Sequence, residues 1–452
     1  MCYNKKSRGG SAVGRKIKLT WIILLAVLFL TGCTTATVEQ MYTPPKRSAA
    51  FEKLQQVIDS AMVGMEYASP LSGENRQTVQ MEDLDGDGIE EYLLFARNTS
   101  ENPLKVLIFR QIQGEFLLSD TIESPGAAFD LIEYVDLDGT NGKELVVGRQ
   151  LSDVVQRSLS VYSFSDGKAR QLMTVPYAKI VPVDLDQNRI SELMVISRGE
   201  SDEDHGVAVL YRCENGTVSR SVEASLSGTT DHIKRIMVSR LHGDVPAVFV
   251  ASSVADSAII TDVFTLKNER FTNVSFSNES GTSVQTLRNY YVYADDIDHD
   301  GVLELPDLID MCPVENAWMA SNQKLIRWYA MDQNGREVDK MFTFHNFNSG
   351  WYLQLDPFLT PRISVIQRDS NYVFYLWDEE FTTTRELMTI FTYSGADREI
   401  AAAEQGAYIL HKTEGVVYAV QTEETAIHLG LLPENLAAGF HLIQKDWKNG
   451  ET

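Results

Sequence analysis

The chain has 452 residues, enough for two or three domains with a buried core, and 44% of them are hydrophobic, as in ordinary globular proteins. Its 63 Asp and Glu residues outnumber its 40 Lys and Arg residues, which gives a formal net charge of −23. This excess of negative charge argues against a nucleic-acid partner, because surfaces that bind nucleic acid are basic.

The first 32 residues have the pattern of a secretory signal peptide. Basic residues come first, and an apolar run from Trp21 to Leu30 follows that is too short to span a bilayer. The ending Leu30-Thr31-Gly32-Cys33 resembles a bacterial lipobox. That resemblance implies removal of residues 1–32, a lipid on Cys33, and an extracytoplasmic protein anchored to the outer face of the cell membrane. An uncleaved anchor with an incidental cysteine is the alternative.

Two further cysteines remain in such a mature chain, Cys213 and Cys312. In an oxidising compartment they could form a disulfide, but two separate thiols fit the sequence equally well. This number of cysteines excludes a disulfide-rich scaffold.

The segment after Cys33 predicts a tether followed by a helix. Residues 33–48 are polar and contain a Pro-Pro pair, so they read as a lipidated tether. From Ala49 to Met62 the apolar residues recur at helical spacing, which predicts an amphipathic helix. Residues 49–75 are therefore expected to form this helix and a lead-in to the next domain.

An acidic nonapeptide then occurs four times: DLDGDGIEE from residue 83, DLDGTNGKE from 136, DLDQNRISE from 184 and DIDHDGVLE from 296. Each copy has an acid at positions 1 and 3, Asp, Thr or Asn at position 5, and Glu at position 9. The starts are 53, 48 and 112 residues apart. The last interval equals two periods, which predicts a fifth repeat without the carboxylates near residue 240.

The sequence around each loop predicts β-structure. A short alternating stretch precedes the loop, and an apolar run and a hairpin signal such as LKVLIFRQIQGEFLLSDTI follow it. Each repeat thus predicts four short antiparallel strands and no helix. A four-stranded unit that recurs about every 50 residues is typical of a β-propeller blade. We expect an all-β propeller over residues 76–345, with five recognisable repeats and a sixth blade left open.

The loops resemble the FG-GAP or VCBS repeats of integrin-α-like β-propellers. In that family the loop between the first two strands of a blade binds calcium through the side chains of positions 1, 3, 5 and 9 and the carbonyl of position 7. The family commonly has Asp at position 9, where this chain has Glu in all four loops. The resemblance implies up to four Ca²⁺ sites, with these ligands: Asp83, Asp85, Asp87, Ile89 and Glu91; Asp136, Asp138, Thr140, Gly142 and Glu144; Asp184, Asp186, Asn188, Ile190 and Glu192; Asp296, Asp298, Asp300, Val302 and Glu304.

Physical chemistry also favours a cation. Calcium takes six to eight oxygen ligands at about 2.3–2.6 Å, and alternate residues of a turn can direct their carboxylates at one point. Without an ion, these like charges repel and raise one another's pKa. The alternative is a solvated Asp-Gly turn, and it is stronger for the loops from 136 and 184, which carry fewer carboxylates. An EF-hand is excluded, because position 12 is not Glu in any copy.

Residues 346–452 predict a small α+β domain. Strand-like stretches alternate with two helical ones, REIAAAEQG and LPENLAAGF. Aromatic residues concentrate here and could line a groove for a carbohydrate or peptide, or could simply form the core. They are Trp351, Tyr352, Phe374, Tyr375 and Trp377.

No local catalytic motif is present: the chain lacks an HExxH zinc pair, a G-x-S-x-G nucleophile elbow and a P-loop. We therefore expect a lipid-anchored, cell-surface, calcium-binding propeller without catalytic activity, which binds an unidentified surface protein, peptide or glycan. The alternative is a carbohydrate-active enzyme, a polysaccharide lyase or hydrolase, built on the propeller. A cluster of Asp, Glu, Arg and His at one end of the propeller would favour the enzyme, and GESDEDHG around His205 is the best local candidate.

Overall fold

The computed structural model describes residues 49–151, 156–199, 205–214, 216–255, 258–288, 292–312, 314 and 324–443. The predicted signal peptide, Cys33 and the predicted tether lie outside these ranges. Within them, no helix combines the length and the apolar character needed to cross a membrane. The chain divides into two units, and the described part of the first comprises residues 49–63 and Ile112–Phe116.

The first unit is built on one helix, α3 (Ala49–Ala61), in the segment where the apolar spacing predicts a helix. Leu54 and Ile58 lie one turn apart on its buried face. Lys53 Nζ lies 2.5 Å from Glu115 Oε1 in the hairpin tip that belongs to the same unit. Both side chains of this ion pair are largely exposed, so it stabilises the unit little.

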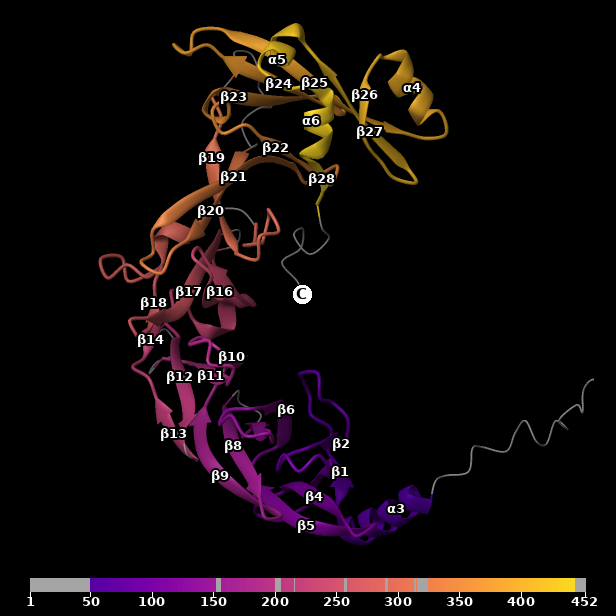
Figure 1. Ribbon diagram of the computed structural model, residues 1–452, viewed down its shortest axis with the longest axis vertical. Helices are drawn as coiled ribbons and strands as arrows, with labels where there is room; N and C mark the ends of the chain where they lie inside the picture. Colours follow the sequence, from indigo (N-terminus) through magenta and orange to yellow (C-terminus); the bar gives the residue numbers. More distant parts are fainter. Residues whose placement is uncertain are drawn as a thin grey trace, which may run out of the picture. The chain divides into compact units, whose positions relative to one another are not determined.

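The second unit consists mainly of antiparallel sheets (Figure 1). The first contains β1 (Glu66–Tyr67), β2 (Val79–Glu82), β3 (Glu91–Arg97), β4 (Leu104–Ile112) and β5 (Glu115–Ser124). The second contains β6 (Ala128–Val135), β7 (Glu144–Gln150), β8 (Arg157–Ser165) and β9 (Lys168–Pro176). The third contains β10 (Lys179–Val183), β11 (Glu192–Ser197), β12 (Val207–Glu214), β13 (Thr217–Arg220) and β14 (Ala224–Ser225).

The fourth sheet contains β15 (Ile233–Leu241), β16 (Val245–Ala255), β17 (Ala258–Lys267) and β18 (Arg270–Asn273). The fifth contains β19 (Glu304–Asp310), β20 (Lys324–Met331), β21 (Glu337–Asn346), β22 (Trp351–Leu355) and β28 (Phe440–Leu442). The sixth contains β23 (Ile363–Arg368), β24 (Asn371–Trp377), β25 (Thr384–Ser394), β26 (Tyr408–Lys412) and β27 (Val416–Thr422). Short 3₁₀ turns occur at η1 (Thr230–His232), η2 (Val284–Thr286) and η4 (Thr360–Arg362).

The prediction of a mostly β chain of antiparallel sheets is confirmed; among the described residues two of the six sheets have four strands and four have five. The fifth repeat, predicted near residue 240, is the β15–β16 hairpin, in which Leu241 lies opposite Val245. Second strands such as β3 and β7 are buried on both faces, which explains why they are continuous apolar runs rather than alternating ones. The outer strand β9 mixes polar and apolar residues, and none of its residues is fully buried.

Consecutive sheets pack face to face through shared hydrophobic clusters. Phe95 of the first sheet meets Phe129 of the second edge-on, with ring centroids 5.3 Å apart. Further clusters join the second sheet to the third, the third to the fourth, the fourth to the fifth and the fifth to the sixth. Among the clusters of the described residues, none joins the first sheet to the sixth. The closed ring that defines a propeller is therefore not established, and the fold is a series of packed antiparallel sheets.

The first three acidic loops connect β2 to β3, β6 to β7 and β10 to β11, and the fourth leads into β19. The first three loops contact one another in order. A Cβ on Gly142 of the second loop would lie 2.4 Å from Leu84 O of the first. Ser191 N of the third loop donates to Asp136 O of the second over 3.1 Å. The fourth loop reaches the fourth sheet, because Leu303 N donates to Arg240 O over 3.1 Å. The loops of consecutive sheets therefore form a continuous polar layer.

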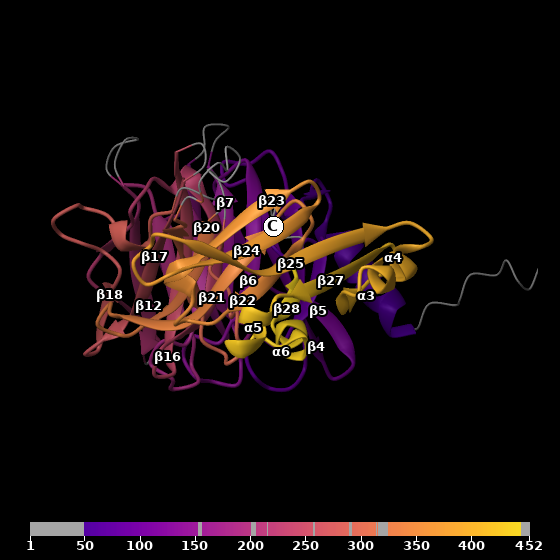
Figure 2. The ribbon, with the colours of Figure 1, turned by 90° about the horizontal axis from the view of Figure 1, so that it is seen from above.

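The last sheet carries three helices, α4 (Arg398–Glu404), α5 (Glu424–His428) and α6 (Pro433–Ala438), which pack on β25, β26 and β27 (Figures 1 and 2). The aromatic residues predicted for this region belong to the core: Trp351 and Phe374 are fully buried. Tyr352 and Trp377 are buried as well, and only Tyr375 is partly exposed. Cys213 and Cys312 are free thiols.

Replacing Gly142 by Ala tests the contact between the first two loops. The new Cβ would lie 2.4 Å from Leu84 O, so one loop must shift. Overpacking of this kind costs about 1–3 kcal/mol, and we expect a loss of that size in the free energy of unfolding measured with urea. Gly415→Ala is the control, because nothing lies within 4 Å of its Cβ position. Equal stability of the two variants would contradict the close contact.

Candidate metal centres

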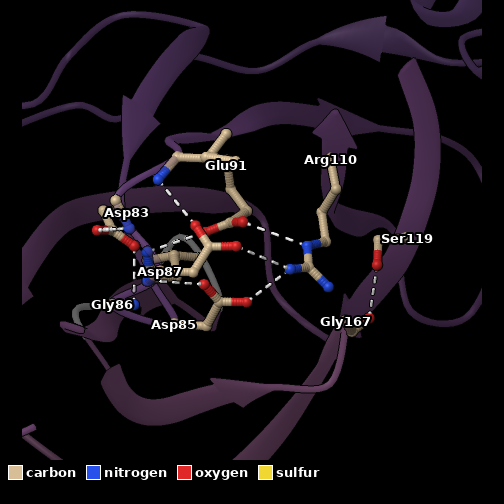
Figure 3. Close-up of polar contacts among 11 residues, drawn as sticks. Asp83, Asp85, Gly86, Asp87, Glu91, Arg110, Ser119 and Gly167 are labelled. Carbon is tan, nitrogen blue, oxygen red and sulfur yellow. Dashed lines mark hydrogen bonds and ion pairs between the residues drawn. The ribbon is translucent and has the colours of Figure 1, made fainter. Parts of the chain in front are cut away.

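The Asp at position 1 organises each loop by accepting backbone N–H groups. Asp83 Oδ1 accepts from Gly86 N over 2.8 Å and Asp83 Oδ2 from Gly88 N over 2.9 Å (Figure 3). In the other loops, Asp136, Asp184 and Asp296 accept in the same way. These bonds wrap the backbone around one carboxylate and fix the direction of the residues that follow.

The loops bring carboxylates together as predicted. In each of four groups, three residues offer oxygen atoms that all lie within 4.8 Å of one another. The groups are Asp83, Asp85 and Glu91; Asp136, Asp138 and Glu144; Asp184, Asp186 and Glu192; and Asp296, Asp298 and Asp300. These oxygen sets suit a hard divalent cation, and the clusters are consistent with calcium.

The Glu at position 9 has a structural role that the sequence did not show. Its Oε2 atom accepts the backbone N–H of position 2, the first apolar residue of the loop, across seven residues of chain. The four bonds, Leu84 to Glu91, Leu137 to Glu144, Leu185 to Glu192 and Ile297 to Glu304, measure 2.9, 2.9, 2.8 and 3.1 Å. Each Glu is buried, with at most 3% of its surface exposed. Glu therefore closes the loop and also presents its second oxygen to the acidic cluster in the first three copies.

The remaining predicted ligands fall into two groups. Asp300 of the fourth loop belongs to a carboxylate cluster, whereas Asp87 at the same position and Glu304 of the fourth loop do not. The side chains of Asp87, Asn188 and Asp300 accept the N–H of position 7, over 2.8, 2.6 and 2.8 Å. The ligand role implied for the carbonyls of position 7, in Ile89, Gly142, Ile190 and Val302, stays a prediction.

Burial changes the acidity of the position 9 carboxyls. Loss of hydration raises the pKa of Glu91 and Glu144 from 4.5 to about 7 and that of Glu304 to about 8, and neighbouring Asp charges add to the effect. The pKa of Glu192 is raised for the same reason. Burial therefore makes each of these carboxyls a weaker acid than an exposed Glu.

Three loops contain a cation supplied by the chain. Arg110 of β4 lies with Nη2 2.8 Å from Asp85 Oδ2 and Nε 3.3 Å from Glu91 Oε1 (Figure 3). Arg212 of β12 holds the third loop in the same way, with Nε 3.0 Å from Glu192 Oε1. Lys340 of β21 contacts Asp300 and lies 3.8 Å from Asp298 Oδ2 in the fourth loop.

The second loop differs from the other three. Within the described part of the chain, Asp136, Asp138 and Glu144 make no ion pair. In the strand register, Leu145 faces Tyr162, so Ser163 takes the place that Arg110 and Arg212 hold in their sheets. The second loop therefore gathers three carboxylates without a basic side chain to balance them.

One carboxylate oxygen in the fourth loop is buried without a hydrogen-bond partner. Glu304 is fully buried, and its Oε1 atom has no hydrogen-bond partner. Lys340 Nζ is 3.9 Å away, too far for a hydrogen bond. A buried carboxylate oxygen without a donor is costly, and a bound cation would remove that cost.

A second site lies at the other end of the second and third sheets. A cleft of about 890 Å³ is lined by the start of β8, the end of β9, the start of β10, the end of β11 and η1. Arg157, Lys179 and Arg198 line it, with Tyr177 at its wall. The other local candidate, the acidic stretch before His205, lies outside the described residues, and His205 itself is exposed.

No protein-family model matches the chain, and no curated protein does. Two similar solved structures are rhamnogalacturonan lyases. The first, YesW, is 10% identical, with a TM-score of 0.28, and the match covers 71% of this chain and 72% of that chain. The second, the exotype enzyme YesX, is 13% identical, with a TM-score of 0.26, and the match covers 71% of this chain and 63% of that chain.

Both similar structures are enzymes, and this finding contradicts the predicted function of a non-catalytic binding protein. Because both TM-scores lie below 0.5, no fold, catalytic residue or substrate of these lyases is assigned to this chain.

The raised pKa values predict how the metal-free protein responds to pH. The folded state holds protons on Glu91, Glu144 and Glu304 that the unfolded chain releases near 4.5. Stability in EDTA should therefore fall as the pH rises from about 4.5 to about 8. In thermal unfolding followed by circular dichroism, Glu144→Gln should reduce this decline, and the exposed control Glu380→Gln should not. Parallel pH profiles for both variants and the parent would contradict the burial effect.

Proposed function

We propose that this chain is a calcium-binding protein of the FG-GAP or VCBS type, in which each acidic loop takes one Ca²⁺. The observation that carries the proposal is the recurrence of three carboxylates within 4.8 Å at the same place in four sheets. Position 1 and position 3 Asp residues would hold the ion in all four loops. Glu91, Glu144 and Glu192 would join them in the first three loops, and Asp300 in the fourth.

Bound calcium would neutralise the acidic cluster of its loop. Since the first three loops contact one another, ions there would also stiffen the junctions between the first three sheets. At a free concentration 100 times its dissociation constant, a ligand that binds only the folded state adds about 2.7 kcal/mol per site. The role of the metal proposed here is thus structural.

The four loops should differ in affinity. A guanidinium or ammonium group inside a carboxylate cluster offsets part of its charge and competes with an incoming cation. Arg110, Arg212 and Lys340 do this in the first, third and fourth loops. The second loop has no such group among the described residues, and we propose that it binds calcium most tightly.

A second candidate function is favoured by the cleft at the opposite end of the sheets. We propose that the chain is a carbohydrate-active enzyme or a component of one, with its saccharide site in that cleft. What supports this is a cavity of about 890 Å³, within the range of small-molecule sites, that carries several polar and charged side chains. Calcium in the loops would then maintain the sheets that shape the cleft.

The location of the protein is a separate proposal, which rests on the sequence of residues 1–33. We propose that Cys33 carries a lipid and anchors the protein to the outer face of the bacterial cell membrane.

Calcium binding is tested by calorimetry on matched variants. Asp138→Asn should remove the tightest site, because it takes a ligand from the loop without an internal cation. Ser163→Arg should weaken the same site about tenfold or more, because it places a guanidinium where Arg110 lies in the first sheet. Arg110→Ser should strengthen binding to the first loop. EDTA should lower the melting temperature of the parent protein. Identical binding isotherms for the parent and all three variants would rule out calcium in these loops.

Lipidation is tested by expressing the full chain and its Cys33→Ser variant in a Gram-positive host. The parent protein should partition into the detergent phase of Triton X-114 and incorporate labelled palmitate. The variant should lose the label. A variant that keeps the label, or a parent that never acquires it, would contradict the proposed anchor.

A further inference from the structure

We propose that the cleft between the second and third sheets binds a saccharide through its carboxylate groups, so that the ligand is an acidic, uronate-type oligosaccharide. This inference rests on the second candidate function and names the class of ligand that its site would take.

The cleft is far from the acidic loops. Strand β7 starts at Glu144, beside the second loop, and ends at Gln150, which pairs with Arg157 at the start of β8. Six steps of about 3.3 Å place these two ends about 20 Å apart. The third sheet repeats this arrangement, because Lys179 at the start of β10 faces Ile196 near the end of β11. The cleft therefore lies where negative charge from the loops is largely screened.

The lining is basic in a strongly acidic protein. The chain carries a net charge of −23, yet Arg157, Lys179 and Arg198 line the cleft, and Asp231 is the one carboxylate among its described lining residues. Arg198 Nη2 lies 2.8 Å from both oxygens of Asp231, on a surface where 40% and 66% of the two side chains are exposed. Such an exposed pair contributes little to stability.

Lys179 is the clearest ligand-binding group. It is exposed at the rim and makes no ion pair or side-chain hydrogen bond with any described residue. Its ammonium group is therefore available to an anion.

The base of the cleft is rigid. The hydroxyl of Tyr177 donates to Asp130 Oδ2 over 2.5 Å, and Arg157 Nε lies 3.5 Å from the same oxygen. Asp130 and Tyr177 are both buried. Gly148 makes this arrangement possible, since a Cβ there would lie 2.2 Å from the Tyr177 hydroxyl. Arg157 is thus held in place by a buried carboxylate, while about 35% of its side chain stays exposed at the cleft.

A buried guanidinium adds to the positive potential. Arg149 is 5% exposed, and its Nη2 atom donates to Ser160 Oγ over 2.7 Å and to Ser158 Oγ over 3.3 Å. No carboxylate pairs with it in the described structure, and its Nε has no hydrogen-bond partner. Ser158 lines the cleft, so this charge lies directly behind the wall.

The chemistry of this surface fits acidic sugars. Guanidinium and ammonium groups bind carboxylates by charge-assisted hydrogen bonds, and Arg does so in a bidentate manner. The hydroxyls of Ser158 and Thr174, also in the lining, suit sugar hydroxyls. A neutral oligosaccharide would leave the ammonium group of Lys179 without an anionic partner.

The test uses the full chain in detergent at constant calcium, with a tetra-galacturonate and a neutral galacto-tetraose as probes in calorimetry. We expect the acidic tetramer to bind at least tenfold more tightly, with an affinity that falls as salt is raised. Equal affinity for both probes would contradict the preference for acidic saccharides but would remain consistent with the proposed carbohydrate function. Binding of neither would overturn both.

Two further experiments test whether the site prefers carboxylates to other anions and whether binding occurs in the cleft. Inorganic polyphosphate or dextran sulfate binding as tightly as tetra-galacturonate would overturn the preference for carboxylate. Lys179→Gln should lower the affinity for the acidic tetramer at least tenfold. It should leave the melting temperature unchanged, because Lys179 makes no ion pair or side-chain hydrogen bond with a described residue. Lys267→Gln makes the same charge change at the other end of the fourth sheet and should have no effect. Equal losses in both variants would refute the cleft as the site.

Discussion

A buried glutamate at the start of the strand that follows each acidic loop is the constraint on which four of the sheets depend. Its carboxylate accepts the N–H at the second position of the acidic loop, and this bond ties the loop to the strand. The arrangement places one carboxylate out of water beside two or more others. A cluster of that charge needs a positive partner, and the rest of the loop chemistry follows from how each sheet supplies one.

The four sheets differ in how they place a positive charge beside the acidic cluster. Arg110, Arg212 and Lys340 supply a tethered charge, and they come from the third or fourth strand of their sheets rather than from the loops. The second sheet has Ser163 in place of the arginine. Its loop lies between the first and third loops and contacts both. A metal ion there would act at the centre of the polar layer that joins the first three sheets.

Much of this architecture is visible in the sequence because the signals are local. The acidic nonapeptide, the hairpin turns and the helical spacing from Ala49 each involve residues close together in the chain. Strand pairing is less local. No motif therefore shows that Glu at position 9 closes the loop, or that Arg110, 19 residues beyond Glu91, supplies a cation to it. The cleft combines residues from three sheets and has no linear signature. Ring closure depends on contacts between the two ends of the chain, which a repeat period does not specify.

The non-catalytic function, now contradicted, was inferred from the absence of local catalytic motifs. Such an absence is weak evidence, because a catalytic site can be assembled from segments that are far apart in the sequence.

The most direct measurement is anomalous diffraction from a crystal grown in calcium and soaked in terbium, which replaces calcium at oxygen-rich sites. The account predicts its strongest peak between Asp136, Asp138 and Glu144, with weaker peaks at the loops that contain Arg110, Arg212 and Lys340. A second loop that holds only water, with its three carboxylates turned apart, would contradict it.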